Sequence, residues 1–283
     1  MSKNNIDLVV LCGTLIDGLS ETPMKNRMVI VQNERITGVV SDNARAPEEI
    51  PFLNLSAQTC LPGLINTHVH FDGNPEDSVD YSVYYRRTPQ ETLQLVIENA
   101  RTTLMTGFTT VRHVGAWFPD AIYTARKIIE AGAAPGPRIQ TAGPYLTIPG
   151  GGGDLNFPEI PSELIPAESQ KGIASTPEGF AARAESAILA GADFLKVIAS
   201  GAVFSVGTEP GTPEMSQEDI EAVVRVAKSY GKQVTAHVHS DQSGRDAILA
   251  GVDSLEHASL LKDSTIRLAR NYGVAFSMDV YNG

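Results

Sequence analysis

The spacing of hydrophobic and polar residues changes near residue 60 and divides the chain into two regions. Before it, short β-branched runs are separated by turn-forming residues, which is typical of strands joined by tight turns. These runs are Ile6–Leu11, Met28–Gln32 and Arg35–Val40. After it, short apolar runs alternate with amphipathic segments, the pattern of βα units on a parallel sheet. We therefore expect an N-terminal part of a small β-sandwich module at 1–60 and a catalytic βα domain at 61–283.

The second region contains strands and helices in regular alternation. We expect strands at 64–71, 108–114, 138–142, 193–199, 233–239, 252–256 and 273–278. We expect helices at 88–105, 120–130, 176–190, from 216 onward, 243–250 and 263–270. A closed (β/α)8 barrel requires one more strand than this series supplies. The predicted fold class is therefore α/β, a TIM-like barrel of the metal-dependent hydrolase type that is incomplete at its C-terminus.

Two long glycine-rich loops follow predicted strands, at 144–174 and 201–214. In a βα barrel, the loops that follow the strands build the active site. The run Pro149-Gly-Gly-Gly-Gly-Asp154 lacks the Gly-Lys-Ser/Thr ending and the helix that a phosphate-binding loop needs. We interpret both loops as a mobile rim or lid of the site rather than as a phosphate cradle.

The histidines of the chain follow the predicted strands. All of them lie on or at the end of a strand of the second region: His68, His70, His113, His237, His239 and His257. Alternate residues of a strand point to the same face, so each His-x-His pair aims two imidazoles at one point. Imidazole is the commonest protein metal ligand near neutral pH, although a single pair can also fill polar positions at a strand end.

A lysine, Lys196, lies in the apolar strand Ala192–Ser200. A buried ammonium must be paired or lose its proton. Three hypotheses follow: a structural ion pair with an acid, a Schiff-base nucleophile, or a lysine carbamylated by CO₂ into an anionic metal ligand. The clustered imidazoles favour the third, because two metal ions about 3.5–4 Å apart need a bridging anion.

Three motifs resemble the amidohydrolase superfamily, in particular its imidazolonepropionase-like and Xaa-Pro dipeptidase (prolidase)-like enzymes. They are Leu61-Pro-Gly-Leu-Ile-Asn-Thr-His-Val-His70, Gly107-Phe-Thr-Thr-Val-Arg112 and Asp253-Ser-Leu-Glu-His257. The resemblance covers nearly the whole chain. It implies two divalent metal ions, expected to be zinc, with carbamylated Lys196 as the bridge. The ligands that it implies are His68, His70, Lys196, His237 and His257.

The resemblance also implies features that this sequence lacks. Relatives carry a catalytic aspartate at the end of strand eight, and no residue here can be assigned that role. Asp279 is the nearest acid, but its position does not match. A histidine that is common in the glycine-rich loop of relatives is replaced by Gly152.

Four further residues are candidates for substrate binding. His239, the second histidine of its pair, would either contact the substrate or support the metal ligands. His113 follows the Val-Arg motif and would contact the pocket, although the structural role is the favoured alternative. Arg112 and Tyr145 are suited to a substrate carboxylate, although Arg112 can equally pair with an acid in the barrel wall. All four belong to strands or loops of the predicted barrel.

Composition limits the partners. The formal net charge of −11 excludes a basic surface for nucleic acid or anionic membranes. Two cysteines are too few for a disulfide framework, and no apolar run approaches a membrane span. We expect a cytoplasmic protein that acts on a small molecule. Because an incomplete barrel leaves unpaired edges, we also expect a homo-oligomer.

The function predicted from these observations is a metal-dependent amidohydrolase. A metal-activated hydroxide would cleave the C–N bond of a dipeptide, an N-acyl amino acid or a cyclic amide. Two alternatives stay open: a non-catalytic barrel scaffold or inactive fragment, and a Schiff-base lyase that acts through Lys196.

Overall fold

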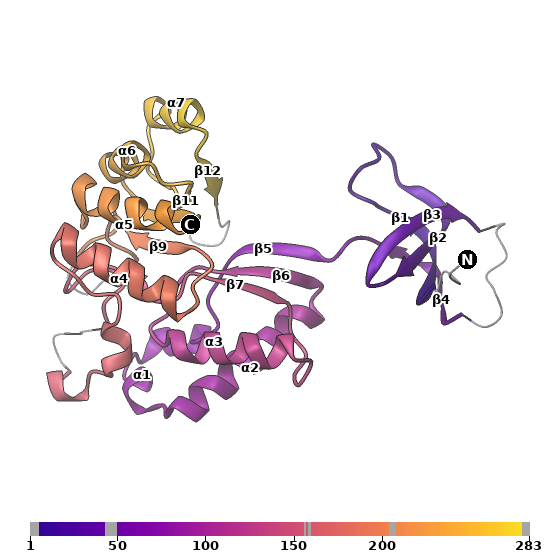
Figure 1. Cartoon of the computed structure of the whole chain (residues 1–283), viewed down its shortest axis with the longest axis horizontal. Helices are drawn as coiled ribbons and strands as arrows, with labels where there is room; N and C mark the ends of the chain where they lie inside the picture. Colours follow the sequence, from indigo (N-terminus) through magenta and orange to yellow (C-terminus); the bar gives the residue numbers. More distant parts are fainter. Residues whose placement is uncertain (1–5, 43–49, 156, 158–159, 204–207, 279–283) are drawn as a thin grey trace. The chain divides into compact units, whose positions relative to one another are not determined.

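The computed structural model describes residues 6–42, 50–155, 157, 160–203 and 208–278 (Figure 1). The chain forms two compact units, Met1–Gly63 and Leu64–Gly283. Each unit is described by itself. Across the described ranges, every helix falls short of the length and apolarity that a membrane span needs.

The N-terminal unit contains a four-stranded sheet in the order β3-β2-β1-β4. Its strands are β1 (Leu8–Leu15), β2 (Met24–Gln32), β3 (Arg35–Ser41) and β4 (Phe52–Cys60). Neighbouring strands are antiparallel except β1 and β4, which are parallel. The hydrophobic pattern does not indicate β4, because this strand has a single β-branched residue and exposes most of its side chains.

A disulfide joins Cys12 of β1 to Cys60 at the end of β4. The two cysteines are 48 residues apart in the sequence. Closing a loop of this length covalently stabilises a domain by about 2–4 kcal/mol. Disulfides are typical of oxidising compartments, and the cytoplasmic location expected from the sequence stays a prediction.

The second unit is built on parallel strands, as the alternating pattern predicts. The first three form one sheet: β5 (Leu64–Val69), β6 (Phe108–His113) and β7 (Arg138–Thr141). The others form a sheet in the order β12-β11-β10-β9-β8: β8 (Tyr145–Leu146), β9 (Leu195–Ile198), β10 (Val234–Val238), β11 (Ser254–His257) and β12 (Ala275–Ser277). The seven predicted strands are present, and among the described residues of this unit only the two-residue β8 is additional. β5 and β12 each pair with one strand in the described part of the chain, and Thr67 and Ser277 hydrogen-bond between them with their oxygens 2.8 Å apart.

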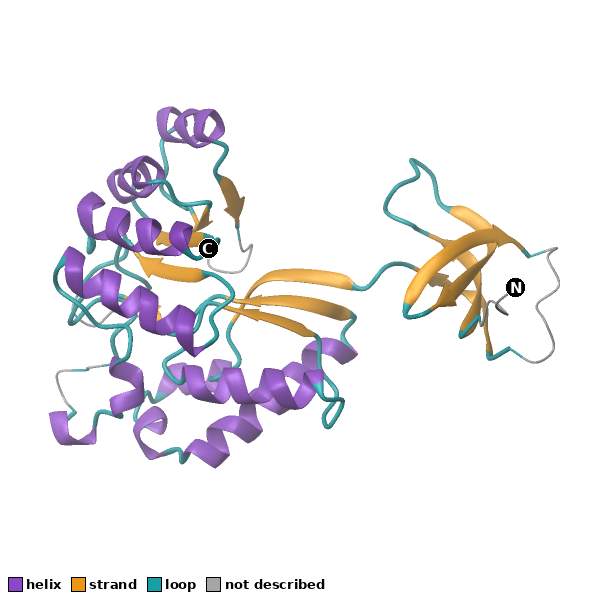
Figure 2. Ribbon diagram, viewed as in Figure 1, coloured by secondary structure: helices purple, strands orange, loops and turns teal. Residues whose placement is uncertain are grey.

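The helices alternate with these strands. They are α1 (Val83–Arg86), α2 (Pro89–Met105), α3 (Pro119–Glu130), α4 (Pro177–Ala190), α5 (Gln217–Ser229), α6 (Asp241–Ala250) and α7 (Asp263–Tyr272). Three short 3₁₀ turns are also present: η1 (Pro75–Val79), η2 (Ser162–Leu164) and η3 (Ala167–Gln170). Figure 2 shows α2 and α3 along one face of β5–β7.

Local sequence signals explain where the longest helix begins and others end. α2 begins with a capping box, in which Glu91 N donates to Thr88 Oγ1 at 3.3 Å and Thr88 N donates to the Glu91 carboxylate at 2.8 Å. α4 and α6 end at Gly191 and Gly251, whose φ angles of 119° and 90° suit glycine. The two largest apolar clusters of the unit lie around β9 and β10 and around α2 and α3, and they stabilise it. The strands that carry most of the candidate residues are therefore anchored in the core.

Candidate metal centre

A cavity of about 540 Å³ lies among β5, β9, β10 and β11. Most of the residues predicted for the site line it: His68, His70, Tyr145, Lys196, His237, His239 and His257. These residues come from positions up to 189 apart in the chain, so only the parallel order of the strands brings them together.

The first His-x-His pair has its ring nitrogens oriented by hydrogen bonds. His68 Nδ1 donates to Glu256 Oε2 at 2.8 Å, and His70 Nδ1 donates to the Gly115 carbonyl at 2.9 Å. A carboxylate and a carbonyl only accept, so each Nδ1 carries the proton and each neutral ring keeps a lone pair on Nε2. The two Nε2 atoms lie 3.3 Å apart. Two lone pairs at this distance repel unless a proton or a cation lies between them, so the pair fits a shared cation.

The second pair, together with His257, forms a compact cluster. One ring nitrogen from each of His237, His239 and His257 lies within 4.8 Å of the others. His237 Nε2 is buried and has no hydrogen-bond partner among the described residues. Burial lowers the pKa of His237 well below 6.5, and the positive charge of Lys196 lowers it further. The imidazole is therefore neutral, which is the form that binds a metal ion.

His257 connects the two pairs. Its ring centroid lies 4.7 Å from that of His68 and 4.5 Å from that of His237. Burial lowers its pKa to about 2. The backbone of His257 adopts a left-handed φ of 66°, followed by Ala258 at 57°. Such conformations are costly for residues other than glycine and concentrate at functional sites.

Lys196 is 1% exposed and lies in the centre of β9, in register with Tyr145 on one side and Thr235 on the other. Its charge contributes to the lowered pKa values of His70, His237 and His257, for each of which burial is the larger cause. The site therefore combines a buried amine with neutral imidazoles.

Glu256 is a site residue that the sequence analysis did not assign. Its carboxylate is fully buried and accepts hydrogen bonds from three donors: His68 Nδ1, Arg112 Nη2 at 3.1 Å and Thr235 Oγ1 at 2.6 Å. Burial alone would raise its pKa, but the hydrogen bond from His68 and the charge of Lys196 lower it below the ordinary value. Its position on β11, directly before His257, was the sequence signal that could have identified it.

The structure places Arg112 and His113 outside the lining of this cavity. Arg112 pairs with Glu256 in the barrel wall and lies 4.7 Å from the centroid of the Phe194 ring. His113 Nε2 accepts a hydrogen bond from Phe71 N at 2.9 Å, and burial lowers its pKa to about 3. Both side chains are engaged by the protein itself, which leaves Tyr145 and His239 as the predicted substrate-binding residues that line the cavity.

Asp72 is a second buried acid that the sequence analysis did not assign. It lines the cavity, and its Oδ2 accepts hydrogen bonds from Trp117 N at 2.9 Å and Phe118 N at 3.4 Å. These bonds fix the loop that leads into α3. Burial raises the pKa of Asp72 to about 6. Asp279, the acid considered in the sequence analysis, lies outside the described residues.

The two glycine-rich loops are joined beside the cavity. Gly152, which lines it, donates its N–H to both carboxylate oxygens of Glu214 at 3.0 Å. Thr208 Oγ1 donates to the same carboxylate at 2.6 Å. Burial raises the pKa of Glu214 above its ordinary value. One acid thus links the two loops that were interpreted as the rim of the site.

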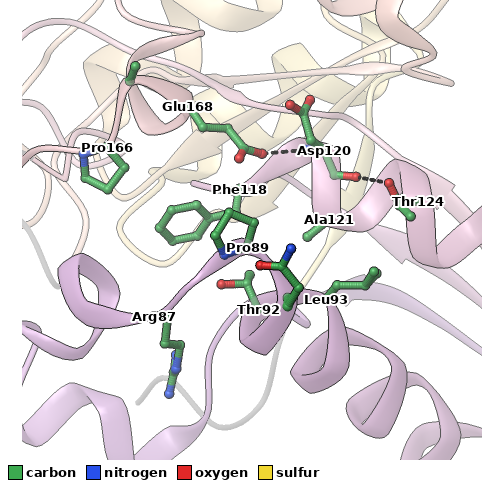
Figure 3. Close-up of a pocket in the computed structure, with 12 residues that line it drawn as sticks. Arg87, Pro89, Thr92, Leu93, Phe118, Asp120, Ala121, Thr124, Pro166 and Glu168 are labelled. Atoms are coloured by element: carbon green, nitrogen blue, oxygen red, sulfur yellow. Dashed lines mark hydrogen bonds between the residues drawn. The ribbon is translucent and has the colours of Figure 1, made fainter.

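A second cavity, of about 390 Å³, lies between the beginnings of α2 and α3 and the turn η3 (Figure 3). Glu168 accepts a hydrogen bond from Asp120 N at 2.7 Å beside it. None of the predicted site residues lines this cavity. We therefore place the functional site in the larger one.

Comparisons with known proteins agree with this geometry. The model of the amidohydrolase family matches residues 59–281. Ochratoxinase of Aspergillus niger is 26% identical over 285 residues, covering 95% of this chain and 58% of the relative. A solved Xaa-Pro dipeptidase with methionine bound in its active site is 27% identical, with a TM-score of 0.84, and the match covers 95% of this chain and 66% of that one. The crystal structure of A. niger ochratoxinase has a TM-score of 0.80 at 24% identity, over 95% of this chain and 64% of that one. The chain thus spans less than two thirds of the length of these relatives, and the family match confirms the predicted resemblance and fold class.

Proposed function

This chain belongs to the amidohydrolase family, and from that premise we propose that it is a metal-dependent hydrolase of an amide C–N bond. The observation that carries the proposal is the convergence of five imidazoles and the Lys196 amine on one cavity. The substrate proposed is a small dipeptide, N-acyl amino acid or cyclic amide. Its similarity to an ochratoxinase and to a Xaa-Pro dipeptidase supports this class without identifying the substrate of this chain.

The donor set fits divalent metal ions. His68, His70, His237 and His257 would hold them, and carbamylated Lys196 would supply the bridging anion. Zinc is the expected metal because nitrogen ligands suit it. A bound divalent ion would lower the pKa of a water molecule toward neutrality and polarise a carbonyl.

The protein's own residues orient these groups. Glu256 keeps the proton of His68 on Nδ1, so that Nε2 faces the cavity. The Tyr145 hydroxyl lies 2.9 Å from His70 Nδ1, where it can also reach a substrate oxygen. Burial raises the pKa of Tyr145 well above 10, so the hydroxyl remains a donor. His239, which directly follows β10, would also contact the substrate.

The test is metal analysis of the purified chain combined with hydrolysis of N-acyl amino acids and Xaa-Pro dipeptides, with added zinc or manganese. We expect bound metal, and activity that a chelator abolishes and zinc restores. Activity that persists in chelator would refute the proposal. A metal-binding chain with no activity on any amide would favour the scaffold, and a borohydride-trapped adduct on Lys196 would favour the lyase.

The role of Lys196 can be tested separately. Lys196→Ala should lose metal and activity, and a short carboxylate such as propionate should restore part of both, because it can replace the carbamate. Lys196→Arg keeps the positive charge but cannot be carbamylated, so it should not be rescued. Equal metal binding in all three proteins would contradict the bridge.

The homo-oligomer also remains a proposal, supported by the edges of β5 and β12 that lack a second neighbour among the described residues. Exposed apolar side chains on these strands, such as Ile65 and Phe276, agree with it. Light scattering of the purified chain tests it, and a monomer across the concentration range would contradict it.

A further inference from the structure

We propose that one side of the large cavity is a subsite for an uncharged aromatic group of the substrate. This inference rests on the function proposed above and names the substrate class: amides that carry a benzyl-type group on one side of the scissile bond. The subsite is an aromatic wall, defined here as Tyr81, Tyr84, Trp117 and Tyr145, all of which line the cavity.

The four rings of the aromatic wall form a continuous series. Tyr81 and Tyr84 are stacked with centroids 6.1 Å apart, and Tyr84 meets Trp117 edge-on at 4.8 Å. Trp117 in turn meets Tyr145 edge-on at 6.0 Å. They come from three separate segments, around α1, before α3 and in β8. Offset and edge-to-face arrangements of this kind are also those that a further aromatic ring can extend.

Hydrogen bonds hold the aromatic wall in place. Trp117 donates its backbone N–H to Asp72 at 2.9 Å and its indole N–H to the Gly153 carbonyl at 3.0 Å. The Trp117 residue is therefore held at its backbone and at its indole N–H, and the one polar atom of the indole already has a partner. A preorganised apolar surface binds a ligand at a lower entropic cost than a mobile one.

The aromatic wall adjoins the histidines proposed as metal ligands. Tyr145 belongs to both, because its hydroxyl lies 2.9 Å from His70 Nδ1 and its ring meets Trp117. An amide whose carbonyl lies at the histidines would therefore place its neighbouring group against these rings. The apolar residues Ala202 and Val203 also line the cavity.

The charges of the cavity favour an uncharged group at the aromatic wall. Of the described residues that line the cavity, Asp72 is the one acid and Lys196 the one amine. A substrate carboxylate at the wall would face Asp72 and the negative faces of the rings. A substrate ammonium would compete for an Asp72 oxygen that already accepts hydrogen bonds from two backbone N–H groups.

Trp117 provides a direct readout, because it is the only tryptophan of the chain. The experiment titrates the full chain, zinc-loaded and metal-stripped, with N-benzylacetamide, N-methylacetamide, phenylacetate and phenethylammonium, and follows indole fluorescence. We expect saturable binding of N-benzylacetamide, at least about tenfold tighter than that of N-methylacetamide, because only the former buries a ring. Phenylacetate and phenethylammonium should bind more weakly than N-benzylacetamide.

Two variants make the test specific. Tyr81 is half-buried, so Tyr81→Ala should weaken the binding of N-benzylacetamide by about tenfold without unfolding the chain. Tyr272, which is 58% exposed on α7, provides the matched control, and Tyr272→Ala should bind as the unaltered protein does. Circular dichroism of both variants confirms that the fold is retained.

Several outcomes would overturn the inference: no saturable fluorescence change, tighter binding of either charged probe, or unchanged binding in Tyr81→Ala. They are separable from failure of the proposed function. Binding of N-benzylacetamide without hydrolysis of any amide would leave the aromatic subsite and remove the hydrolase. Hydrolysis of aliphatic N-acyl amino acids with no binding at the aromatic wall would do the reverse.

Discussion

The two His-x-His pairs share one sequence pattern but are held in different ways. His68 lies on β5, a strand with one neighbour among the described residues, and His70 directly follows it, whereas His237 lies on the central β10 and His239 directly follows it. In the first pair, both Nδ1 atoms donate to acceptors from other segments. In the second, His237 Nε2 is buried without a partner in the described structure.

The difference shows two routes to a neutral imidazole with a lone pair available. Hydrogen bonds select the tautomer in the β5 pair, where the strand itself is less enclosed. In β10, burial keeps His237 neutral, because the five residues of this strand are all buried and it lies between β9 and β11. A histidine pair can thus be held by specific acceptors or by burial in the core, and the two pairs should respond differently to substitution.

The largest effect is expected when a proposed metal ligand from either pair is removed. His68→Ala and His237→Ala should each lose bound metal and at least about a thousandfold in activity, because the metal supplies several kcal/mol of transition-state stabilisation. Metal content by mass spectrometry and kcat/KM measure both. Gln233→Ala, at an exposed position just before β10, is the matched control and should change neither. Retained metal in either histidine variant would remove that pair from the centre.

The next effect distinguishes the two pairs. Glu256→Gln removes the carboxylate that accepts from His68 Nδ1 and should weaken metal binding by about 10- to 100-fold. Thr235→Ser keeps the hydroxyl that donates to Glu256 and should bind metal normally. Competition with a chromogenic chelator gives the affinities. Equal affinity in the Glu256 variant would mean that packing alone also orients the β5 pair.

A smaller effect concerns His113, the last residue of β6. Its Nε2 accepts a hydrogen bond from Phe71 N. Burial lowers the pKa of His113 from 6.5, the value taken for the unfolded chain, to about 3 in the folded chain. Between these two pH values, His113 is therefore protonated only in the unfolded chain. Its contribution to stability is therefore complete above about pH 6.5 and is lost as the pH falls toward 3.

The measurement is urea unfolding of metal-stripped protein at several pH values, followed by Trp117 fluorescence. His113→Gln should reduce the pH slope of the unfolding free energy by about 1.4 kcal/mol per pH unit near pH 5, which corresponds to one proton. Since other buried histidines also titrate, a slope should remain in the variant. An unchanged slope would show that His113 is protonated in the folded state.

The smallest effect separates the two members of the β10 pair. His239→Asn should keep its metal and its kcat while KM rises about three- to tenfold, as expected for the loss of one hydrogen bond to substrate. His237→Asn should lose metal instead. If both variants lose metal, His239 is a ligand, which its distance from His237 and His257 also permits.

Strand and helix positions were largely predictable, because apolar runs bounded by glycine, proline and capping residues define them locally. The strands of the barrel and six of its helices lie where the pattern places them. The exceptions are short or weakly patterned: β4, β8 and α1. Two to four residues carry too little periodicity to identify an element, and β4 is polar because most of it is exposed.

Site residues were predictable only as far as their chemistry is visible in one residue. A histidine or a lysine in an apolar strand can be recognised as a candidate from the sequence alone, whereas the roles of Glu256 and Asp72 depend on their hydrogen-bond partners. The donor to Glu256 lies 188 residues away in the sequence, and the donor to Asp72 lies 45 residues away. Arg112 shows the same limit, because the sequence permits both a substrate contact and the ion pair that the structure contains.

The sequence by itself determined the donor atoms, the strands that carry them and the alternation that turns both histidines of each pair to one side. Only the tertiary structure decided which ring nitrogens of His68 and His70 donate, which acceptors orient them and which aromatic rings line the cavity beside them. The physical reason is that a strand's geometry is set by its own residues, whereas a tautomer and a cavity wall are set by neighbours that arrive from distant segments through parallel pairing.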